Sequence, residues 1–196
     1  MLYLLRHGET EYNRESRIQG WLHSDLTELG LQQVARMGDK LRELIDRPQD
    51  WVVIASPQER AVRSAEIVRA RAGVPAPIEF DENLKEVTVG SWEGSTYEDI
   101  ARTFPGALAN ATLHDRFFHS PDGDTYESLA ARVTQALDAV QRHPTPNRIV
   151  VSHGVAGRLF RGFYAGLPKD EALRLDAPQT AFFRLHQGRI ERIACD

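Results

Sequence analysis

The sequence has a single cysteine, Cys195, and it lacks any apolar run close to the roughly 20 residues that span a membrane. One cysteine cannot form an internal disulfide, and it offers no framework for a cysteine-bound metal ion. The chain opens directly on an apolar strand pattern, without the basic and longer apolar segments of a signal peptide. These absences predict a cytoplasmic protein with no membrane contact.

Several functional motifs are missing as well. The sequence has no G-x-x-x-x-G-K-[ST] loop, which argues against nucleotide-driven phosphoryl transfer. It has no H-E-x-x-H motif, and His114 and His119 are five residues apart, a spacing that fits no metal-ligand pair on one helix face. The net charge of −4 argues against a general nucleic-acid surface, yet it allows a locally positive site for a small anion. We therefore predict no metal, no cofactor and no nucleic-acid partner.

Apolar strand patterns alternate with amphipathic helix patterns along the 196 residues. Strands are predicted over 1–6, 51–55, 78–80 and 148–152, with a final hairpin over 181–186 and 189–194. Ser56 and Asp124 are each predicted to cap a long helix, because a Glu follows each of them three residues later. Shorter helices are predicted over 96–104 and 107–117. This order predicts one α/β domain, a mostly parallel sheet with helices on both faces in three layers, and a small helical cap over about 95–125.

Reactive side chains follow four of the predicted strands. The first strand is followed by His7 and ends in Arg6, and the later strands are followed by Ser56 with Arg60, by Glu86, and by His153 with Gly154. The carboxyl ends of parallel strands meet at one edge of a sheet, so these residues are expected to converge. We interpret this edge as the active site.

The residue types at this edge are typical of phosphoryl transfer. Two arginines match a phosphate in the geometry of a bidentate fork, and the helix starts that follow Ser56 and His153 would add backbone N–H donors. A neutral imidazole can attack phosphorus, and a carboxyl group can protonate the leaving alkoxide and later activate water. Two histidines and a carboxylate could also ligate a metal, but two arginines in the same site would repel a cation.

With these residues in view, the chain resembles the histidine phosphatase superfamily, also called the phosphoglycerate mutase-like family. The resemblance spans nearly the whole chain and rests on four blocks in order: Arg6-His7-Gly8-Glu9-Thr10 with Asn13, Ser56-Pro57-x-x-Arg60-Ala61, Leu84-x-Glu86, and Ser152-His153-Gly154. The resemblance implies a phosphoglycerate mutase-like α/β/α fold.

The resemblance also implies roles for single residues. His7 is the nucleophile that becomes phosphorylated, and Glu86 is the acid and base. The phosphoryl group is held by Arg6, Arg60 and His153, with Asn13 and Gly154 as further phosphate-pocket residues, while Gln19 reaches the rest of the substrate. The chain departs from the family pattern at His23, Asp25 and Gln58, where relatives often have Asp, Pro and an apolar residue.

Members of this family are phosphatases or mutases. Those mutases that use a bisphosphate carry paired basic residues after the acid block, whereas residues 95–125 here carry only Arg102 and Arg116. We therefore predict a phosphatase of small phosphorylated metabolites, with a phosphoglycerate mutase-type isomerase and a non-catalytic phospho-ligand binding module as alternatives. Apolar side chains of the cap suit a substrate with an uncharged body, or simply pack the cap against the sheet. The sequence leaves the oligomeric state undecided between a monomer and a homodimer that pairs through the edge of the final hairpin.

Overall fold

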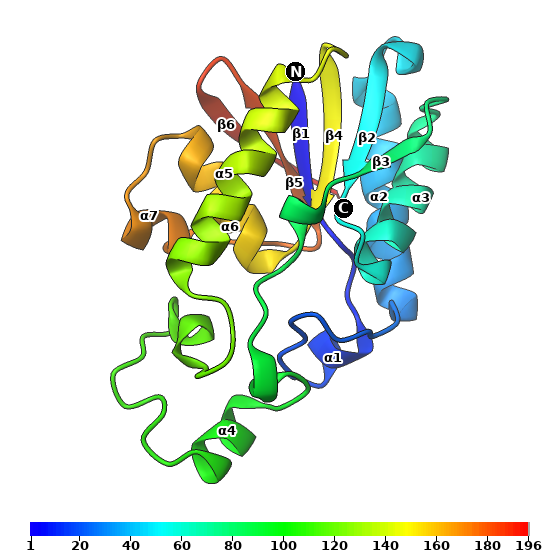
Figure 1. Cartoon of the computed structure of the whole chain (residues 1–196). Helices are drawn as coiled ribbons and strands as arrows, with labels where there is room; N and C mark the ends of the chain where they lie inside the picture. Colours follow the sequence, from blue (N-terminus) through cyan, green and yellow to red (C-terminus); the bar gives the residue numbers. More distant parts are fainter. Residues whose placement is uncertain (196) are drawn as a thin grey trace.

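The computed structural model describes residues 1–195, and within them six strands form one sheet in the order β3-β2-β4-β1-β5-β6 (Figure 1). The strands are β1 (Leu2–Arg6), β2 (Trp51–Ala55), β3 (Ile78–Phe80), β4 (Asn147–Ser152), β5 (Ala181–His186) and β6 (Arg189–Ala194). The first four are parallel to one another, and β5 and β6 add an antiparallel hairpin at one edge. The predicted, mostly parallel sheet is confirmed.

The hairpin turn explains why the last two strands reverse direction. Gln187 and Gly188 both have left-handed backbone angles, with φ of 49° and 74°. Two consecutive residues with positive φ make the tight turn whose twist matches that of an antiparallel pair. The hairpin predicted from the Gln-Gly pair is confirmed with the same strand boundaries.

Helices cover both faces of the sheet, as Figure 1 shows. Side chains of β1 alternate between the faces: Leu2 and Leu4 pack with α5 (Tyr126–Arg142), α6 (Gly154–Tyr164) and α7 (Lys169–Arg174), whereas Tyr3 and Leu5 pack with α2 (Glu28–Leu44) and α3 (Glu59–Ala72). This period of two follows from the strand pleat. The three-layer α/β/α architecture is confirmed.

The segment that leads into α5 differs from the prediction. Three 3-10 turns, η2 (Glu82–Leu84), η3 (Gly90–Trp92) and η4 (Arg116–His119), and one helix, α4 (Tyr97–Thr103), lie between β3 and α5. A further 3-10 turn, η1 (Pro48–Asp50), precedes β2. The helix predicted over 107–117 is absent: residues 105–110 and 113–115 form turns, and η4 takes up 116–117. The Asp115 carboxylate accepts the Thr112 backbone N–H at 2.7 Å, a local bond that competes with a helix. Trp92 and Ile100, both fully buried, are at the centre of a small separate cluster of apolar side chains.

Two predicted helix caps serve other partners. Thr125, not Asp124, caps α5, and the Asp124 carboxylate instead pairs with Arg132 at 2.9 Å. The N-cap of α3 is Gln58, whereas the fully buried Ser56 hydroxyl bonds to His153. The Asp124 carboxylate also accepts the Thr88 backbone N–H at 3.1 Å, so in both cases the predicted capping side chain bonds to a residue far away in the sequence.

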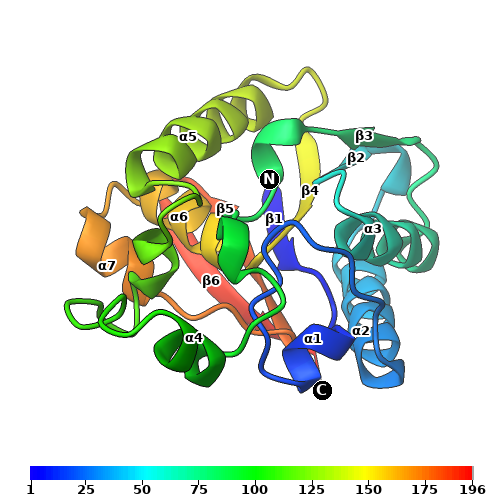
Figure 2. The same cartoon turned by 60° about the horizontal axis from the view of Figure 1, so that its bottom comes forward.

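Figure 2 brings the carboxyl ends of the parallel strands forward, where α1 (Glu11–Arg14) and α4 lie beyond the sheet. No helix within residues 1–195 is both long and apolar enough to cross a membrane. Because β1, β2 and β4 are parallel, the loops that follow them lie at the same edge of the sheet, next to the cap. That edge holds the candidate site.

Candidate active site

The strand register brings the two predicted histidines together. Arg6 pairs with Ser152 across the parallel strands β1 and β4, and the His7 backbone N–H donates to the Ser152 carbonyl at 3.1 Å. His7 directly follows β1 and His153 directly follows β4, so the two histidines are neighbours. The centroids of their rings are 5.2 Å apart. Both side chains are almost fully buried.

The ring of His7 is held in one tautomer. Its Nδ1 lies 2.7 Å from the Gly8 carbonyl oxygen, which can only accept, so Nδ1 carries the proton and Nε2 keeps its lone pair. Burial, and then the charges of Arg60 and Arg6, hold the pKa of His7 well below its usual value. The ring is therefore neutral at pH 7, with a free nitrogen suited to nucleophilic attack.

His153 is fixed by a neighbour that local sequence did not predict. The Ser56 hydroxyl lies 2.7 Å from His153 Nε2, while His153 Nδ1 is buried without a hydrogen-bond partner within residues 1–195. Burial and the charge of Arg60 lower the pKa of His153 as well. An anion bound beside it would counteract both effects and favour the imidazolium.

Two arginines flank the histidines, and each is oriented by backbone carbonyls. Arg6 donates from Nη1 to the Ala177 carbonyl at 2.8 Å, and Arg60 donates from Nη2 to the Gly20 carbonyl at 2.8 Å. The Nε atoms of both are buried without a partner among the described residues. Burial lowers the pKa of Arg60 to about 10, so it remains charged at neutral pH.

Glu86 is held at the start of α6. The backbone N–H groups of Val155 and Ala156 each donate to its carboxylate at 3.0 Å, and that of Val87 donates at 3.0 Å. Both carboxylate oxygens therefore act as acceptors. A Cβ on Gly154 would lie 3.4 Å from Glu86 Oε2 and 3.7 Å from Arg6 Cζ. The Glu86 carboxylate and the Arg6 guanidinium therefore both lie close to the backbone of residue 154.

Gln58, one of the departures from the family pattern, ties two of these parts together. Its Oε1 accepts the backbone N–H of Glu86 at 2.7 Å, and its Nε2 donates to the Gly20 carbonyl at 3.1 Å. The same Gly20 carbonyl accepts from Arg60. The backbone of Glu86 is thereby positioned relative to Arg60, a contact that sequence reasoning missed.

Asn13 is oriented by a residue from the other end of the chain. Gln179 Nε2 donates to Asn13 Oδ1 at 3.0 Å and to the His7 carbonyl at 3.2 Å. The Asn13 amide nitrogen is left to donate elsewhere. Gln19, by contrast, is buried, accepts from the Thr10 hydroxyl at 2.9 Å and donates to the Leu22 carbonyl at 3.3 Å, so its amide is engaged on both sides.

Gly8 is required for packing, not for a left-handed turn. Its φ is not in the left-handed region, and a Cβ there would lie 2.3 Å from the Gly30 carbonyl oxygen of α2. Gly30 is equally constrained, because its own Cβ would lie 2.0 Å from the Glu9 carbonyl oxygen. The two glycines let the loop after β1 lie directly against the first turn of α2.

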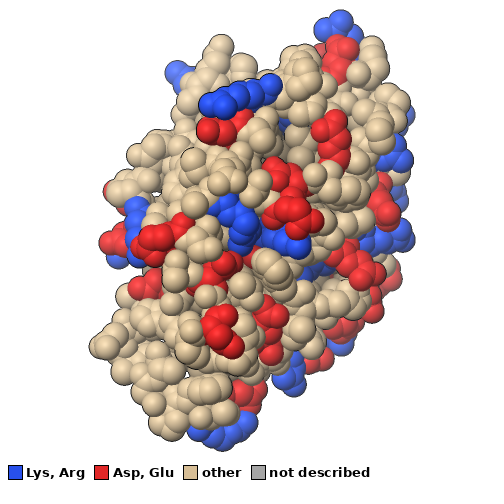
Figure 3. Space-filling view, viewed as in Figure 1, with Lys and Arg blue, Asp and Glu red and all other residues tan. Residues whose placement is uncertain are grey.

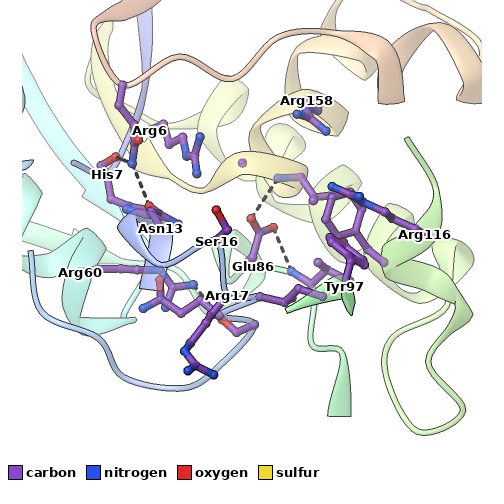
Figure 4. A pocket seen from close by; sticks show the side chains of 18 residues that line it. Arg6, His7, Asn13, Ser16, Arg17, Arg60, Glu86, Tyr97, Arg116 and Arg158 are labelled. Atoms are coloured by element: carbon purple, nitrogen blue, oxygen red, sulfur yellow. Dashed lines mark hydrogen bonds between the residues drawn. The ribbon is translucent and has the colours of Figure 1, made fainter. Parts of the chain in front are cut away.

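These residues surround a cavity of about 460 Å³, shown in Figure 4. It is lined by seven of the eight residues predicted for the site: Arg6, His7, Asn13, Gln19, Arg60, Glu86 and Gly154. The eighth, His153, lies beside His7. We call the group Arg6, His7, Arg60 and His153 the histidine end of the cavity.

The opposite wall comes in part from the predicted cap, and one of the apolar residues of the cap, Phe117, lines the cavity. Three polar residues that were not predicted for the site line it as well: Tyr97 from α4, Arg116 from η4 and Arg158 from α6, which we call the cap end. Figure 4 shows Glu86 between the two ends. Sequence reasoning noted Arg116 without placing it in the site; Arg158 lies four residues after Gly154, the i, i+4 spacing that puts both on one helix face.

The cavity is strongly positive although the protein is not. Five arginines and one carboxylate, Glu86, line it, against a net charge of −4 for the whole chain. On the face seen in Figure 3, acidic and basic side chains are interspersed and form no single large patch. A concave site with this balance attracts small anions.

Comparison with known proteins agrees with this chemistry. The family described as histidine phosphatase superfamily (branch 1) matches residues 2–192. A probable phosphoglycerate mutase GpmB from Erwinia tasmaniensis is 35% identical over 191 residues, covering 95% of this chain and 85% of the relative. A counterpart from Salmonella arizonae is 35% identical over 171 residues, covering 85% of this chain and 75% of the relative.

Solved structures extend the likeness to phosphatases. Bacillus stearothermophilus YhfR superimposes with a TM-score of 0.81 at 30% identity, covering 100% of this chain and 95% of that one. The mycobacterial glucosyl-3-phosphoglycerate phosphatase Rv2419c gives 0.77 at 27% identity, covering 98% and 96%. A putative alpha-ribazole-5'-P phosphatase from Escherichia coli K-12 shares the fold, with a TM-score of 0.82 at 22% identity and coverage of 100% and 96%. With the family match over residues 2–192, these likenesses show that the chain belongs to the histidine phosphatase superfamily, whose members are phosphatases or mutases that use a histidine.

Proposed function

We propose that this protein is a phosphomonoesterase that works without a metal ion, through a phosphohistidine formed on His7. The observation that carries the proposal is the His7 ring itself, whose Nδ1 proton is held by the Gly8 carbonyl at 2.7 Å and whose Nε2 is free beside two arginines. A lowered pKa keeps this nitrogen unprotonated at neutral pH.

In the first step, the lone pair of His7 Nε2 attacks phosphorus, and the bond between phosphorus and the ester oxygen breaks. Arg6, Arg60, His153 and the Asn13 amide stabilise the charge on the transferring group, a contribution that dominates phosphoryl transfer. Glu86 enters this step as the neutral carboxylic acid and gives its proton to the leaving alkoxide, which departs as the alcohol and leaves Glu86 as the carboxylate. The product is an enzyme with a new P–N bond.

In the second step, the Glu86 carboxylate takes a proton from water, and the resulting hydroxide attacks phosphorus. The P–N bond breaks, inorganic phosphate leaves, and His7 returns to its neutral tautomer. The start of α6 supports the role of Glu86, because the carboxylate lies where backbone N–H groups fix both of its oxygens.

The test is hydrolysis of 4-nitrophenyl phosphate in the presence of a strong chelator. Wild-type enzyme should turn over with EDTA and form an acid-labile phosphoenzyme in rapid-quench experiments. His7→Ala should lose at least about 1,000-fold in kcat/KM and trap no phosphoenzyme. His186→Ala serves as control, because His186 is exposed and pairs with Arg189 in the hairpin, away from the cavity. Full activity in His7→Ala, or activity abolished by EDTA, would refute the proposal.

A mutase is the second candidate, and the cap end favours it. Arg116 and Arg158 bring a pair of cations into the cavity from two different elements, although the sequence has no adjacent basic pair after the acid block. Two relatives are named probable phosphoglycerate mutase. The candidate predicts that 2- and 3-phosphoglycerate interconvert faster than either is hydrolysed when a bisphosphate is present, and dominant hydrolysis removes it.

A further inference from the structure

The orientation of the Asn13 amide decides what this residue offers to a phosphoryl group. An amide presents either its N–H groups, which attract a phosphoryl oxygen, or its own oxygen, which repels one. Asn13 Oδ1 accepts from Gln179 Nε2 at 3.0 Å and from the Thr10 backbone N–H at 3.4 Å, whereas Asn13 Nδ2 makes no hydrogen bond within residues 1–195. Because Asn13 lines the cavity, its N–H groups are the part that a ligand would meet.

Gln179 is itself oriented by a backbone group, whose polarity is fixed. Its Nε2 donates to the His7 carbonyl at 3.2 Å as well as to Asn13 Oδ1. A carbonyl oxygen only accepts, so the His7 carbonyl requires the Gln179 nitrogen, not its oxygen, at this position. Both N–H groups of Nε2 are then in use, and the atom of Asn13 that faces them has to be the oxygen. Hydrogen-bond polarity therefore passes from the His7 backbone, through Gln179, to the N–H groups of Asn13 in the cavity.

The other contacts of Asn13 hold its amide less firmly. The 3.4 Å distance from the Thr10 nitrogen is longer than that of a usual N–H to oxygen bond. Asn13 belongs to α1, which has four residues and none that is buried, so packing does not fix the side chain either. Gln179 is therefore the main support of the amide orientation.

The loop that carries Gln179 also holds another residue of the histidine end. This loop joins α7 to β5, and within it the Ala177 carbonyl accepts from Arg6 Nη1 at 2.8 Å. The Asp176 carboxylate ties the loop to α6, because it pairs with Arg161 at 3.3 Å. A loop that is anchored in this way is suited to keep functional side chains in one geometry.

We propose that Gln179 is a positioning residue for the phosphoryl transfer of the proposed function, on which this inference rests. It acts through Asn13, whose N–H groups it holds toward the oxygens of the phosphoryl group that moves to and from His7. Without Gln179 the Asn13 amide is able to turn over, and its oxygen then faces the phosphoryl group in part of the molecules. Preorganised donors stabilise the transition state most, so the effect is expected on the rate of transfer.

The experiment is a double-mutant cycle on Asn13 and Gln179, with the rate of phosphoenzyme formation from 4-nitrophenyl phosphate as the readout. Asn13→Ala removes the donor and should lower this rate by about 10- to 100-fold, the effect of losing a hydrogen bond to a charged group. Gln179→Leu should lower it by about 3- to 10-fold, because the Asn13 donor remains but is no longer held. The double variant should be no slower than Asn13→Ala, since Gln179 then has nothing to orient.

NMR of protein isotope-labelled at asparagine gives a second readout. The side-chain amide signals of Asn13, identified by their loss in Asn13→Ala, should shift when orthovanadate binds to the wild type and should shift less in Gln179→Leu. A role in folding alone predicts equal shifts, and it predicts that the losses in rate of the two single variants multiply. Either result overturns the role of Gln179, as does an unchanged rate in Gln179→Leu.

Gln32→Leu is the matched control, because Gln32 also donates its amide to a side-chain oxygen, that of Glu28 at 3.4 Å, but it is exposed on α2 and does not line the cavity. It should leave the rate unchanged. Gln179→Met, which has nearly the same length as the native side chain, repeats the cycle with different packing. A wild-type enzyme that forms no phosphoenzyme overturns the proposed function, whereas multiplied losses in an active enzyme overturn the role of Gln179 only.

Discussion

The two ends of the cavity are built in different ways. The histidine end is formed where β1, β2 and β4 stop, so neighbouring strands set the positions of its residues, and Ser56, Gly8 and the backbone carbonyls fix each side chain. The cap end comes from α4, a 3-10 turn and one turn of α6, joined by irregular chain. Its arginines are held by an aromatic ring and by packing, not by ion pairs.

This difference separates two tasks within one site. Strand ends that are locked by the sheet suit a reaction that requires atoms to be positioned within fractions of an ångström. A wall made of irregular chain can change from one family member to another without disturbing the sheet. We infer that the histidine end determines the reaction and that the cap end determines which phosphate ester is accepted.

Glu86 lies between the two ends of the cavity, and its substitution is expected to have the largest effect on kcat among the variants compared below. Glu86→Gln removes the proposed acid, and kcat should fall by about 10²- to 10⁴-fold for a substrate with an alkoxide leaving group. The loss in the phosphorylation step should be far smaller for 4-nitrophenyl phosphate, because nitrophenolate leaves without a proton. Rapid-quench measurement of that step checks this contrast.

The variant also has a structural cost, because one backbone N–H at the start of α6 loses its acceptor. A purely structural defect would slow both substrates by the same factor. Equal losses for the two leaving groups would therefore remove Glu86 from the role of acid.

The next effect is the dependence of the free energy of unfolding on pH. His7 and His153 are neutral in the folded protein because burial, followed by the charge of Arg60, lowers the pKa of each. In the unfolded chain each returns to about 6.5, so below that pH the unfolded state binds more protons. The free energy of unfolding is complete above pH 6.5 and should decrease as the pH falls, by up to about 1.4 kcal/mol per pH unit for each histidine.

Urea unfolding in phosphate-free buffer between pH 7 and 5.5 measures this slope. His7→Asn keeps a side-chain donor for the Gly8 carbonyl but cannot titrate, so it should reduce the slope. A flat profile in the wild type, or the same slope in His7→Asn, contradicts the assignment of neutral buried histidines to the histidine end.

The histidine end was also the predictable one. The predicted strands 1–6, 51–55 and 148–152 are typical of buried strands because residues 1–5, 51–55 and 149–151 are continuously apolar. Parallel topology then brings Arg6, Arg60 and His153 to one edge. The cap predicted at Ser56 was wrong, as was the cap predicted at Asp124 outside this end. Ser56 bonds to His153 and Asp124 accepts the Thr88 backbone N–H, and these partners are 97 and 36 residues away, too far for local spacing to reveal.

The cap end could not be predicted in the same way. The element predicted there, a helix over 107–117, does not form, and residues 104–115 are mostly turns, so nothing in their order placed Arg116 on the Tyr97 ring. Gln179 lies in a loop before β5, and its contacts with Asn13 and His7 join positions 166 and 172 residues apart. Arg158 did carry a signal, the four-residue spacing from Gly154, that could have put it in the site.

A smaller effect is expected where a departure from the family pattern supports the histidine end. Gln58→Leu leaves the backbone N–H of Glu86 without its acceptor, and we expect about a tenfold fall in kcat with little change in KM. The loss should again be greater for alkoxide than for nitrophenolate leaving groups. Steady-state kinetics with both substrate types measures the contrast.

Gln33→Leu is the matched control, because Gln33 is another buried glutamine, and it accepts the backbone N–H of Glu9 at 2.8 Å. Both variants should lose stability by about 1–3 kcal/mol. Only Gln58→Leu should change the dependence on the leaving group. The same dependence in both variants would show that the Gln58 contact is structural alone.

The smallest effect is expected in the cap. Leu113 is 64% exposed beside Arg116, whereas Leu41 of α2 is fully buried under the sheet. Leu113→Ala should change the free energy of unfolding by no more than about 0.5 kcal/mol, while the same substitution at Leu41 should cost about 2–5 kcal/mol. Urea unfolding of the two variants gives the comparison directly. If Leu113→Ala were as costly as Leu41→Ala, the cap would be part of the folding core, and it could not vary independently of the chemistry at the histidine end.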